Sequence, residues 1–186
     1  PVASFPDERA GGLSNAPERI SNSSLATSPV LFMVICAHCP FVKHIESCIT
    51  RIDKDHRDSL QIIAISSNSL ITHPQDSPKY LAEQANFHGW SFPYLFDEEQ
   101  SFAKSLKAAC TPDFFLFSSN ATQNHYLKYR GQLDESRPGN NVAVSGKDLI
   151  AAIDAILHDR NISSEQRPSI GCNIKWHPGE EPSWFG

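Results

Sequence analysis

Apolar residues along the chain alternate between short continuous runs and helical spacing, which predicts alternating strands and helices. Buried strands are predicted at 29–35 and 60–65, where β-branched and aliphatic residues dominate. Between these runs, Val42, Ile45 and Ile49 recur at spacings of three and four, which indicates an amphipathic helix over 41–54. This order of strand, helix and strand predicts a parallel pair of strands at the centre of a sheet.

The rest of the chain predicts further elements of both kinds. Helices are expected at 77–87, 97–109 and 146–158. Strands are expected at 94–96, 113–117 and 125–130. Gly89 is expected to end its helix, and Asp97 to be the N-cap of the next one with Gln100 at the capping-box position. A polar link between the last two strands indicates a hairpin, so the predicted sheet is mixed.

These elements predict one α/β domain that spans residues 1–186. Residues 1–28 are polar and rich in turn-forming residues, and we expect them to form a loop or an extended arm over the core. The core is predicted at 29–158, and the tail at 159–186 has no clear periodicity. A chain of 186 residues suits a single domain with its own core.

Charge and composition make two classes of partner poor candidates. The chain has 16 Lys and Arg against 21 Asp and Glu, a net charge of −5, and no basic stripe that would bind a phosphate backbone. No apolar run approaches the ~20 residues that span a bilayer. We therefore expect neither nucleic acid nor a membrane as a partner. No secretory signal is visible, which predicts a cytoplasmic protein.

The most informative residues are two cysteines in the string Cys36-Ala-His-Cys-Pro40, between the first predicted strand and its helix. Five cysteines cannot all pair within one chain and are too sparse for a disulfide scaffold. Two thiols at a helix start can instead close a small redox-active disulfide. We expect the helix N-terminus to lower the pKa of Cys36, and His38, when protonated, to favour the thiolate further. Cys36 would attack a substrate disulfide and Cys39 would resolve the mixed disulfide.

Two other roles are open to these thiols, a zinc site and inert packing. A zinc site would need more ligands, for which Cys172, His44 or His73 could be recruited, but a second cysteine pair is lacking. The strand–helix context favours redox chemistry over zinc, and we expect no metal and no cofactor. Two inert buried thiols are disfavoured because the pair follows a strand instead of lining an apolar face.

Thr111 and Pro112 immediately precede the strand predicted at 113–117. A proline is tolerated at the start of a strand. If the Thr111–Pro112 bond is cis, backbone groups there would face the dithiol and could pair with an extended substrate. If it is trans, the proline only begins the strand.

The combination of these motifs resembles the thioredoxin-like superfamily, and within it the AhpC/TSA-type peroxiredoxin-like subgroup. The resemblance rests on the dithiol, on Thr111-Pro112, on the string 92–97 and on the tail string 169–179, and covers about residues 29–179. It implies a thioredoxin fold, with Cys36 as nucleophile, Cys39 as resolving thiol and a cis Pro112.

Two positions depart from the family patterns. Met33 stands where peroxiredoxins carry a threonine three residues before the reactive cysteine, which weakens the expectation of peroxide chemistry. Val30 stands where thioredoxins carry a buried aspartate, so the group that accepts the Cys39 proton is left open.

The remaining cysteines are expected to have unequal roles. Cys48 fits the apolar face of its helix, and Cys110 is interpreted as a packing residue despite its place beside Thr111. Cys172 is a candidate auxiliary thiol, or a wall of the substrate groove, if the tail folds back over the dithiol. The alternative is a tail that only packs over a sheet edge.

The sequence therefore predicts a thiol–disulfide oxidoreductase that works by mixed-disulfide exchange through Cys36 and Cys39. Thr111, Pro112 and His38 would position the substrate. The expected partners are a protein or small-molecule disulfide and a thiol electron donor. The alternatives are a thiol peroxidase and a non-catalytic redox-sensing or binding module.

Overall fold

The computed structural model of the chain describes residues 8–10, 19–20, 25, 28–120 and 124–185. Seven strands form a mixed sheet in the order β2-β1-β5-β4-β3-β7-β8. Their bounds are Glu8–Ala10 (β1), Arg19–Ile20 (β2), Val30–Val34 (β3), Gln61–Ser66 (β4), Tyr94–Phe96 (β5), Asp113–Ser119 (β7) and His125–Gly131 (β8). β3 pairs with β4 in parallel and with β7 in antiparallel orientation, and β7 forms a hairpin with β8. The predicted mixed α/β sheet is confirmed.

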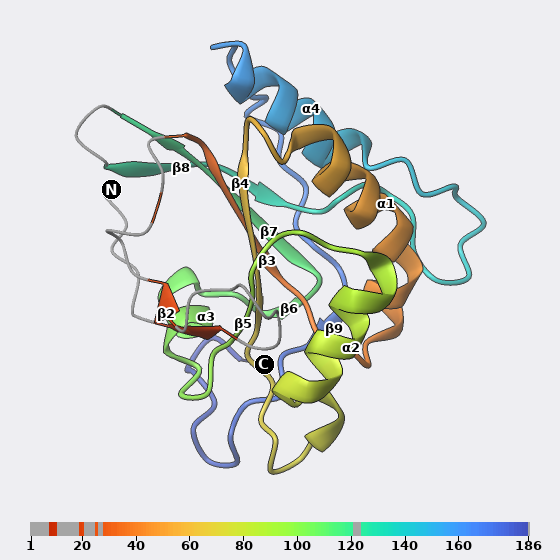
Figure 1. Cartoon of the computed structure of the whole chain (residues 1–186), viewed down its shortest axis with the longest axis vertical. Coiled ribbons are helices and arrows are strands. Elements are labelled where there is room, and N and C mark those ends of the chain that lie inside the picture. The colour runs from red at the N-terminus through yellow and green to blue at the C-terminus, as the bar shows by residue number, and fades with distance from the viewer. Residues whose placement is uncertain (1–7, 11–18, 21–24, 26–27, 121–123, 186) are drawn as a thin grey trace.

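Four α-helices cover the two faces of this sheet (Figure 1). Their bounds are Pro40–His56 (α1), Pro78–His88 (α2), Ser101–Leu106 (α3) and Lys147–Leu157 (α4). Successive residues of a strand point to opposite faces. Leu31 and Met33 accordingly pack with the residues of α1, α2 and α4, whereas Phe32 packs on the other face with Phe102 of α3. Burial on both faces explains why the sequence of β3 is a continuous apolar run.

The helix predicted at 97–109 is shorter and begins later than expected. α3 covers only Ser101–Leu106, and its N-cap is Gln100 in the left-handed conformation. Asp97 still satisfies the first turn, because its buried carboxylate accepts hydrogen bonds from the backbone N–H groups of Phe102 (3.2 Å) and Ala103 (2.9 Å). Asp97 therefore caps α3 from the preceding turn, three residues before the N-cap Gln100, an arrangement that the capping-box pattern does not describe.

Two segments without predicted elements also contain strands. β1 in the N-terminal arm pairs with β5 at the edge of the main sheet. In the tail, β9 (Cys172–Asn173) pairs with β6 (Cys110–Thr111) in a separate two-stranded sheet. Ile174 and Trp176 follow β9 and are buried in the core on the α3 side of the main sheet. No helix in the described ranges is long and apolar enough to cross a membrane.

Candidate active site

The dithiol lies in the short connection between β3 and α1. β3 ends at Val34, and α1 begins at Pro40 with Cys39 as its N-cap. Cys36 and Cys39 are both free thiols, and neither has exposed surface. The predicted strand–helix junction is therefore where both sulfurs lie, and Cys39 is the one at the helix terminus.

Thr111 and Pro112 lie against this pair, although about seventy residues separate them from it in the chain. The Thr111 hydroxyl is 3.6 Å from the Cys36 sulfur, and the Cys39 sulfur, when protonated, donates to the Thr111 carbonyl oxygen at 3.3 Å. The Thr111–Pro112 peptide bond is cis. The two positions singled out in the sequence thus meet in one site.

His38 is tied to a buried carboxylate that sequence reasoning missed. Its Nδ1–H donates to Asp76 Oδ2 at 2.5 Å, and Asp76 has no exposed surface. The other oxygen, Oδ1, accepts the backbone N–H groups of Ala37 (3.0 Å) and His38 (3.1 Å). Asn68 donates to Oδ2 at 2.8 Å. Asp76 lies in a polar loop with no motif around it, so only its contacts identify it as a support for the dithiol loop.

The electrostatics of the site favour a thiolate on Cys39. A hydrogen bond from the Cys36 thiol lowers the pKa of Cys39 to about 4, in spite of its burial. The Thr111 hydroxyl, the Cys172 thiol and the Val42 backbone N–H act in the same direction. Val42 belongs to the first turn of α1, whose N–H groups lack partners within the helix and stabilise negative charge.

The environment acts on Cys36 in the opposite direction. Its hydrogen bond to Cys39, its burial and the Asp76 carboxylate all raise the pKa of Cys36 above its ordinary value. The predicted lowering of the Cys36 pKa is therefore not found, because burial and the Asp76 carboxylate both disfavour a thiolate on Cys36. His38 lies 3.8 Å from the Cys36 sulfur through the same Nδ1 that serves Asp76.

Cys36, His38 and Asp76 also offer ligand atoms within 4.8 Å of one another, the one such group in the described part of the chain. Three ligands could hold a metal ion only with further donors. Both Asp76 oxygens already accept hydrogen bonds from the loop and from Asn68. His44, named as a recruitable ligand, hydrogen-bonds instead to Ser136 at 2.6 Å.

Cys48 and Cys110 are buried, as expected for packing residues, and Cys172 takes the position for which two alternatives were open. Cys48 is buried on α1, where Arg51 donates to its sulfur at 3.4 Å. Cys110 is buried, and burial raises its pKa to about 12. Cys172 is partly exposed, and its residue pairs with Thr111 across the β6–β9 sheet. The tail therefore folds back onto the dithiol site.

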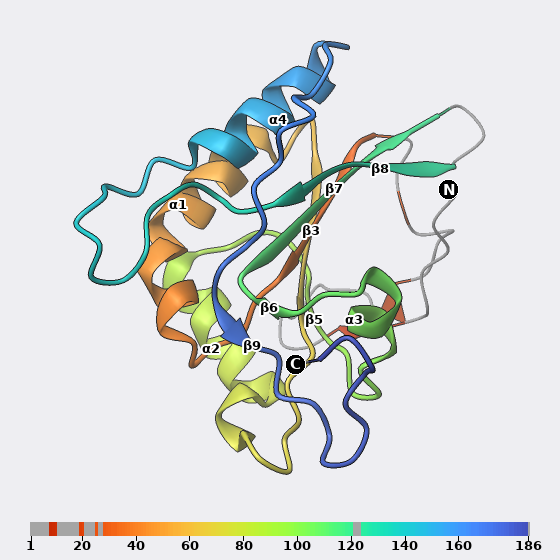
Figure 2. The same ribbon diagram turned by 180° about the vertical axis from the view of Figure 1, so that it is seen from behind.

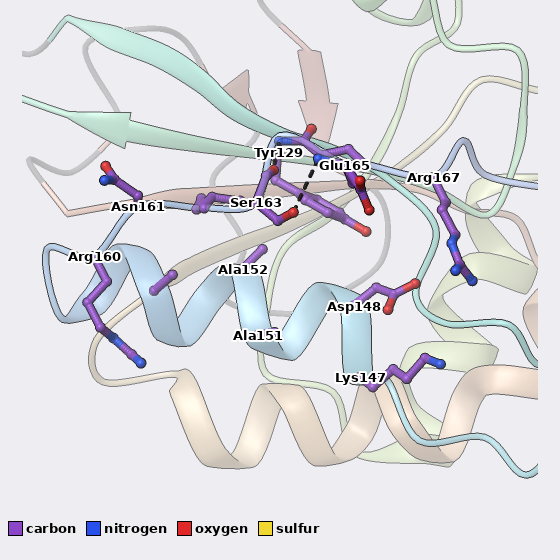
Figure 3. A pocket seen from close by; sticks show the side chains of 13 residues that line it. Tyr129, Lys147, Asp148, Ala151, Ala152, Arg160, Asn161, Ser163, Glu165 and Arg167 are labelled. Carbon is purple, nitrogen blue, oxygen red and sulfur yellow. Dashed lines mark hydrogen bonds between the residues drawn. The ribbon is translucent and has the colours of Figure 1, made fainter.

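One cavity lies away from the dithiol. It has a volume of about 450 Å³ and lies between α4 and the segment 160–167 (Figure 3). Its charged residues Arg160 and Arg167 pair with Asp154 and Glu135, and no cysteine lines it. A second cavity, of about 370 Å³, begins at Ala37 and His38 and extends along α2. The second cavity is the one that adjoins the dithiol loop.

Comparisons with known proteins agree with this geometry. The AhpC/TSA family matches residues 5–126. A hypothetical protein from Sinorhizobium meliloti is 35% identical, with a TM-score of 0.85 over 96% of this chain and 95% of its own. An uncharacterized conserved protein from Geobacillus kaustophilus is 38% identical, with a TM-score of 0.85 over 96% of this chain and 93% of its own.

More distant structures share the fold alone. A secreted disulfide oxidoreductase from Mycobacterium tuberculosis is 12% identical, with a TM-score of 0.56 over 80% of this chain and 94% of its own. No curated protein matches the chain. The match to more than half of the chain, with two relatives above one-third identity, shows that this protein belongs to the AhpC/TSA family of thioredoxin-fold proteins and has a thiol redox role.

Proposed function

We propose that the chain is a thiol–disulfide oxidoreductase that works through the Cys36–Cys39 dithiol. The observation that carries the proposal is the position of the two thiols just before and at the N-terminus of α1, where both sulfurs contact Thr111. A thiolate is the nucleophile in disulfide exchange, and a neighbouring thiol can complete the reaction.

The exchange proceeds in two balanced steps. The thiolate attacks one sulfur of a protein or small-molecule disulfide, the substrate S–S bond breaks, and the released substrate thiolate takes up a proton. The second cysteine then loses its proton and attacks the mixed disulfide, which closes the Cys36–Cys39 disulfide and releases the other substrate thiol. A thiol electron donor restores the dithiol.

The order of attack is proposed from the position of the two thiols relative to α1. The resemblance to the family implied that Cys36 attacks first, but Cys39 is the N-cap of α1 and is nearer to the unpaired N–H groups that stabilise a thiolate. We therefore propose that Cys39 attacks and that Cys36, which holds the proton, resolves. Thr111 and Pro112 border the sulfurs, and His38 holds the loop through Asp76.

The cavity of about 370 Å³ beside the dithiol loop is proposed as the place where the substrate chain lies. Its lining includes Phe87, with 85% of its surface exposed, and Tyr80, with 43%. Exposed aromatic side chains offer apolar area to a partner. Because both sulfurs are buried, we propose that the Ala37–His38 side of the loop moves to admit the substrate.

The test is catalysed reduction of a small disulfide-linked protein by dithiothreitol. We expect the wild-type chain to accelerate the reaction and Cys39→Ser to return it to the uncatalysed rate. Cys48→Ser is the matched control, because it removes another buried thiol of the same helix and should leave the rate unchanged. A Cys39→Ser variant that keeps the wild-type rate contradicts the proposal.

Trapping the mixed disulfide in the variants Cys36→Ser and Cys39→Ser tests which cysteine attacks first. Both variants carry Cys172→Ser as well, because Cys172 lies against Cys39. Cys36→Ser should accumulate the substrate adduct on Cys39, whereas Cys39→Ser should accumulate none. An adduct found only in Cys39→Ser would establish the opposite order, with Cys36 as the attacking thiol.

A thiol peroxidase is the second candidate, favoured by the match of residues 5–126 to the AhpC/TSA family. The thiolate would attack the peroxide O–O bond, releasing an alcohol or water and leaving a sulfenic acid, which the second thiol converts to a disulfide with loss of water. Stopped-flow measurement of peroxide consumption tests it, and a rate no faster than that of free cysteine excludes it.

A further inference from the structure

Cys172 is brought to the dithiol by the pairing of β9 with β6 (Figure 2). Its register partner is Thr111, whose carbonyl oxygen lies 3.3 Å from the Cys39 sulfur. Cys172 also packs against the core cluster that contains Cys36 and Cys39. Three of the five cysteines therefore converge on Thr111.

Gly171 permits this close approach. A Cβ atom at position 171 would lie 2.0 Å from the Thr111 carbonyl oxygen and 3.1 Å from Pro112 Cδ. No side chain fits at 2.0 Å from a backbone atom, so only glycine lets the tail lie on the Thr111–Pro112 peptide. The residue beside Cys172 is thus adapted to hold the tail against the site.

Hydrogen bonds also hold the tail on the C-terminal side of Cys172. The Ile174 backbone N–H donates to the Ala109 carbonyl at 3.1 Å, and the Lys175 N–H donates to Asn68 Oδ1 at 2.8 Å. Asn68 in turn donates to Asp76, the carboxylate that supports the dithiol loop. The position of Cys172 is therefore set by the same network that positions His38.

Cys39 and Cys172 share the N-terminus of α1. Cys39 is the N-cap of the helix, and Cys172 lies on the strand that pairs with Thr111. The Cys172 thiol and the Val42 backbone N–H both lower the pKa of Cys39, and the Phe41 backbone N–H acts in the same direction on the pKa of Cys172. Two neighbouring N–H groups that have no partner within the helix can thus stabilise a negative charge on either sulfur.

We propose that Cys172 is a third redox thiol, which moves the active-site disulfide from Cys36–Cys39 to Cys39–Cys172. The Cys172 thiolate attacks the Cys39 sulfur, the Cys39–Cys172 bond forms, and the Cys36–Cys39 bond breaks. Cys36 leaves as a thiolate and takes up the proton that Cys172 lost, so the step is redox-neutral. This inference rests on the proposed function, because that function supplies the first disulfide.

The exchange carries the disulfide from buried sulfurs toward the surface. Cys36 and Cys39 have no exposed surface, whereas Cys172 is partly exposed. A dithiol reductant would attack the Cys172 sulfur, form a mixed disulfide and then leave as its own disulfide. Its two electrons restore the Cys39 and Cys172 thiols, and the enzyme need not open the dithiol loop to be reduced.

The test is disulfide mapping of the full chain. The reduced protein is oxidised briefly with a small disulfide, quenched in acid, alkylated and analysed as peptides by mass spectrometry. We expect Cys39–Cys172 in a fraction of the wild-type chain and as the main product in Cys36→Ser. Cys36→Ser/Cys110→Ser should keep that link, because Cys110 is the matched thiol on the paired strand. Cys36→Ser/Cys172→Ser should instead keep the small-disulfide adduct on Cys39.

Absence of the Cys39–Cys172 link from both the wild type and Cys36→Ser overturns the inference, and its presence in either supports it. The results distinguish a failure of this inference from a failure of the proposed function. If Cys39→Ser abolishes turnover but no link forms, the oxidoreductase stands without the third thiol. If the link forms but Cys39→Ser keeps the wild-type turnover, the proposed catalytic function is wrong.

Discussion

At the scale of single residues, Asp76 joins the dithiol loop to the rest of the molecule. Its carboxylate is fully buried and accepts hydrogen bonds from Ala37, His38 and Asn68. A buried charge is tolerated only when its hydrogen bonds are satisfied, as they are here. The same charge raises the pKa of Cys36.

Asp76→Asn should therefore change both stability and reactivity. The amide puts an N–H₂ group where Oδ2 accepted hydrogen bonds, and losing charge-assisted bonds of this kind costs about 2 kcal/mol. Removing the charge should also lower the pKa of Cys36. Urea unfolding and the pH dependence of Cys36 alkylation measure the two effects. Asp58→Asn, at an exposed position, is the control, and equal behaviour of the two variants would contradict the role of Asp76.

The Cys39 thiolate predicts a pH dependence of the stability of the reduced protein. The pKa of Cys39 is about 4 in the folded state against an ordinary 9.0. Between these values the unfolded chain binds the extra proton, so the free energy of unfolding rises with pH and this contribution is lost as the pH falls through about 4. Asp113, whose pKa burial raises to about 6, acts oppositely, since its contribution is lost as the pH rises through about 6.

A comparison of the reduced and oxidised proteins separates the contribution of Cys39 to the pH dependence of stability from that of Asp113. Asp113 titrates in both forms, whereas the Cys39 thiolate exists only in the reduced one. Urea unfolding at about pH 6 and about pH 8 should show a greater gain in stability for the reduced wild type than for the oxidised protein or Cys39→Ser. The same pH dependence in the reduced wild type and in Cys39→Ser would show that Cys39 is not a thiolate.

At the scale of elements, the helices and strands with strong periodicity were predicted closely, and those that depend on distant partners were not. α1 and β3 lie where the apolar spacing predicts them, since β3 is buried at every position and α1 is buried at positions three and four residues apart. β6 and β9 have two residues each, too few for any periodicity. They exist because Gly171 allows the tail to pack on Thr111.

Gly171→Ala tests this pairing. The added methyl group would overlap the Thr111 carbonyl, so β9 must move, and overpacking of this kind costs about 1–3 kcal/mol. We also expect the Cys39–Cys172 link to be lost. Gly179→Ala is the control in the same tail, because nothing lies within 4 Å of its added Cβ and only its positive φ of 84° is strained. Urea unfolding and disulfide mapping of both variants should differ; similar results would mean that the approach at Gly171 is not required.

At the scale of the whole molecule, the tail completes the core as well as the site. Ile174 and Trp176 are 1% and 5% exposed and pack on the α3 side of the sheet. The connection from Lys175 to Asn68 links this core to the loop that holds Asp76. The segment expected as an aperiodic tail therefore contributes to the structure of the domain.

Trp176→Ala should accordingly destabilise the whole chain. Removing a large buried aromatic side chain costs about 3–5 kcal/mol, because the cavity is only partly refilled. Trp184→Ala removes the same side chain at a site that is 42% exposed and should cost less than about 0.5 kcal/mol. Chemical unfolding of the two variants compares them directly, and equal stabilities would mean that the tail does not support the core.

The sequence by itself determined most of the α/β elements and the dithiol between a strand and a helix, and the resemblance to the family implied Thr111-Pro112 as the counterpart of the dithiol. The elements and the dithiol depend on residues close together in the chain, whose spacing is visible in the sequence. Only the tertiary structure decided that Asp76 supports the loop, that Cys39 is the N-cap of α1, and that Cys172 reaches the pair. The contacts responsible join residues 38 positions apart for Asp76 and His38, and 107 apart for Lys175 and Asn68. Local periodicity carries no information about contacts at such separations, because they depend on the path of the whole chain.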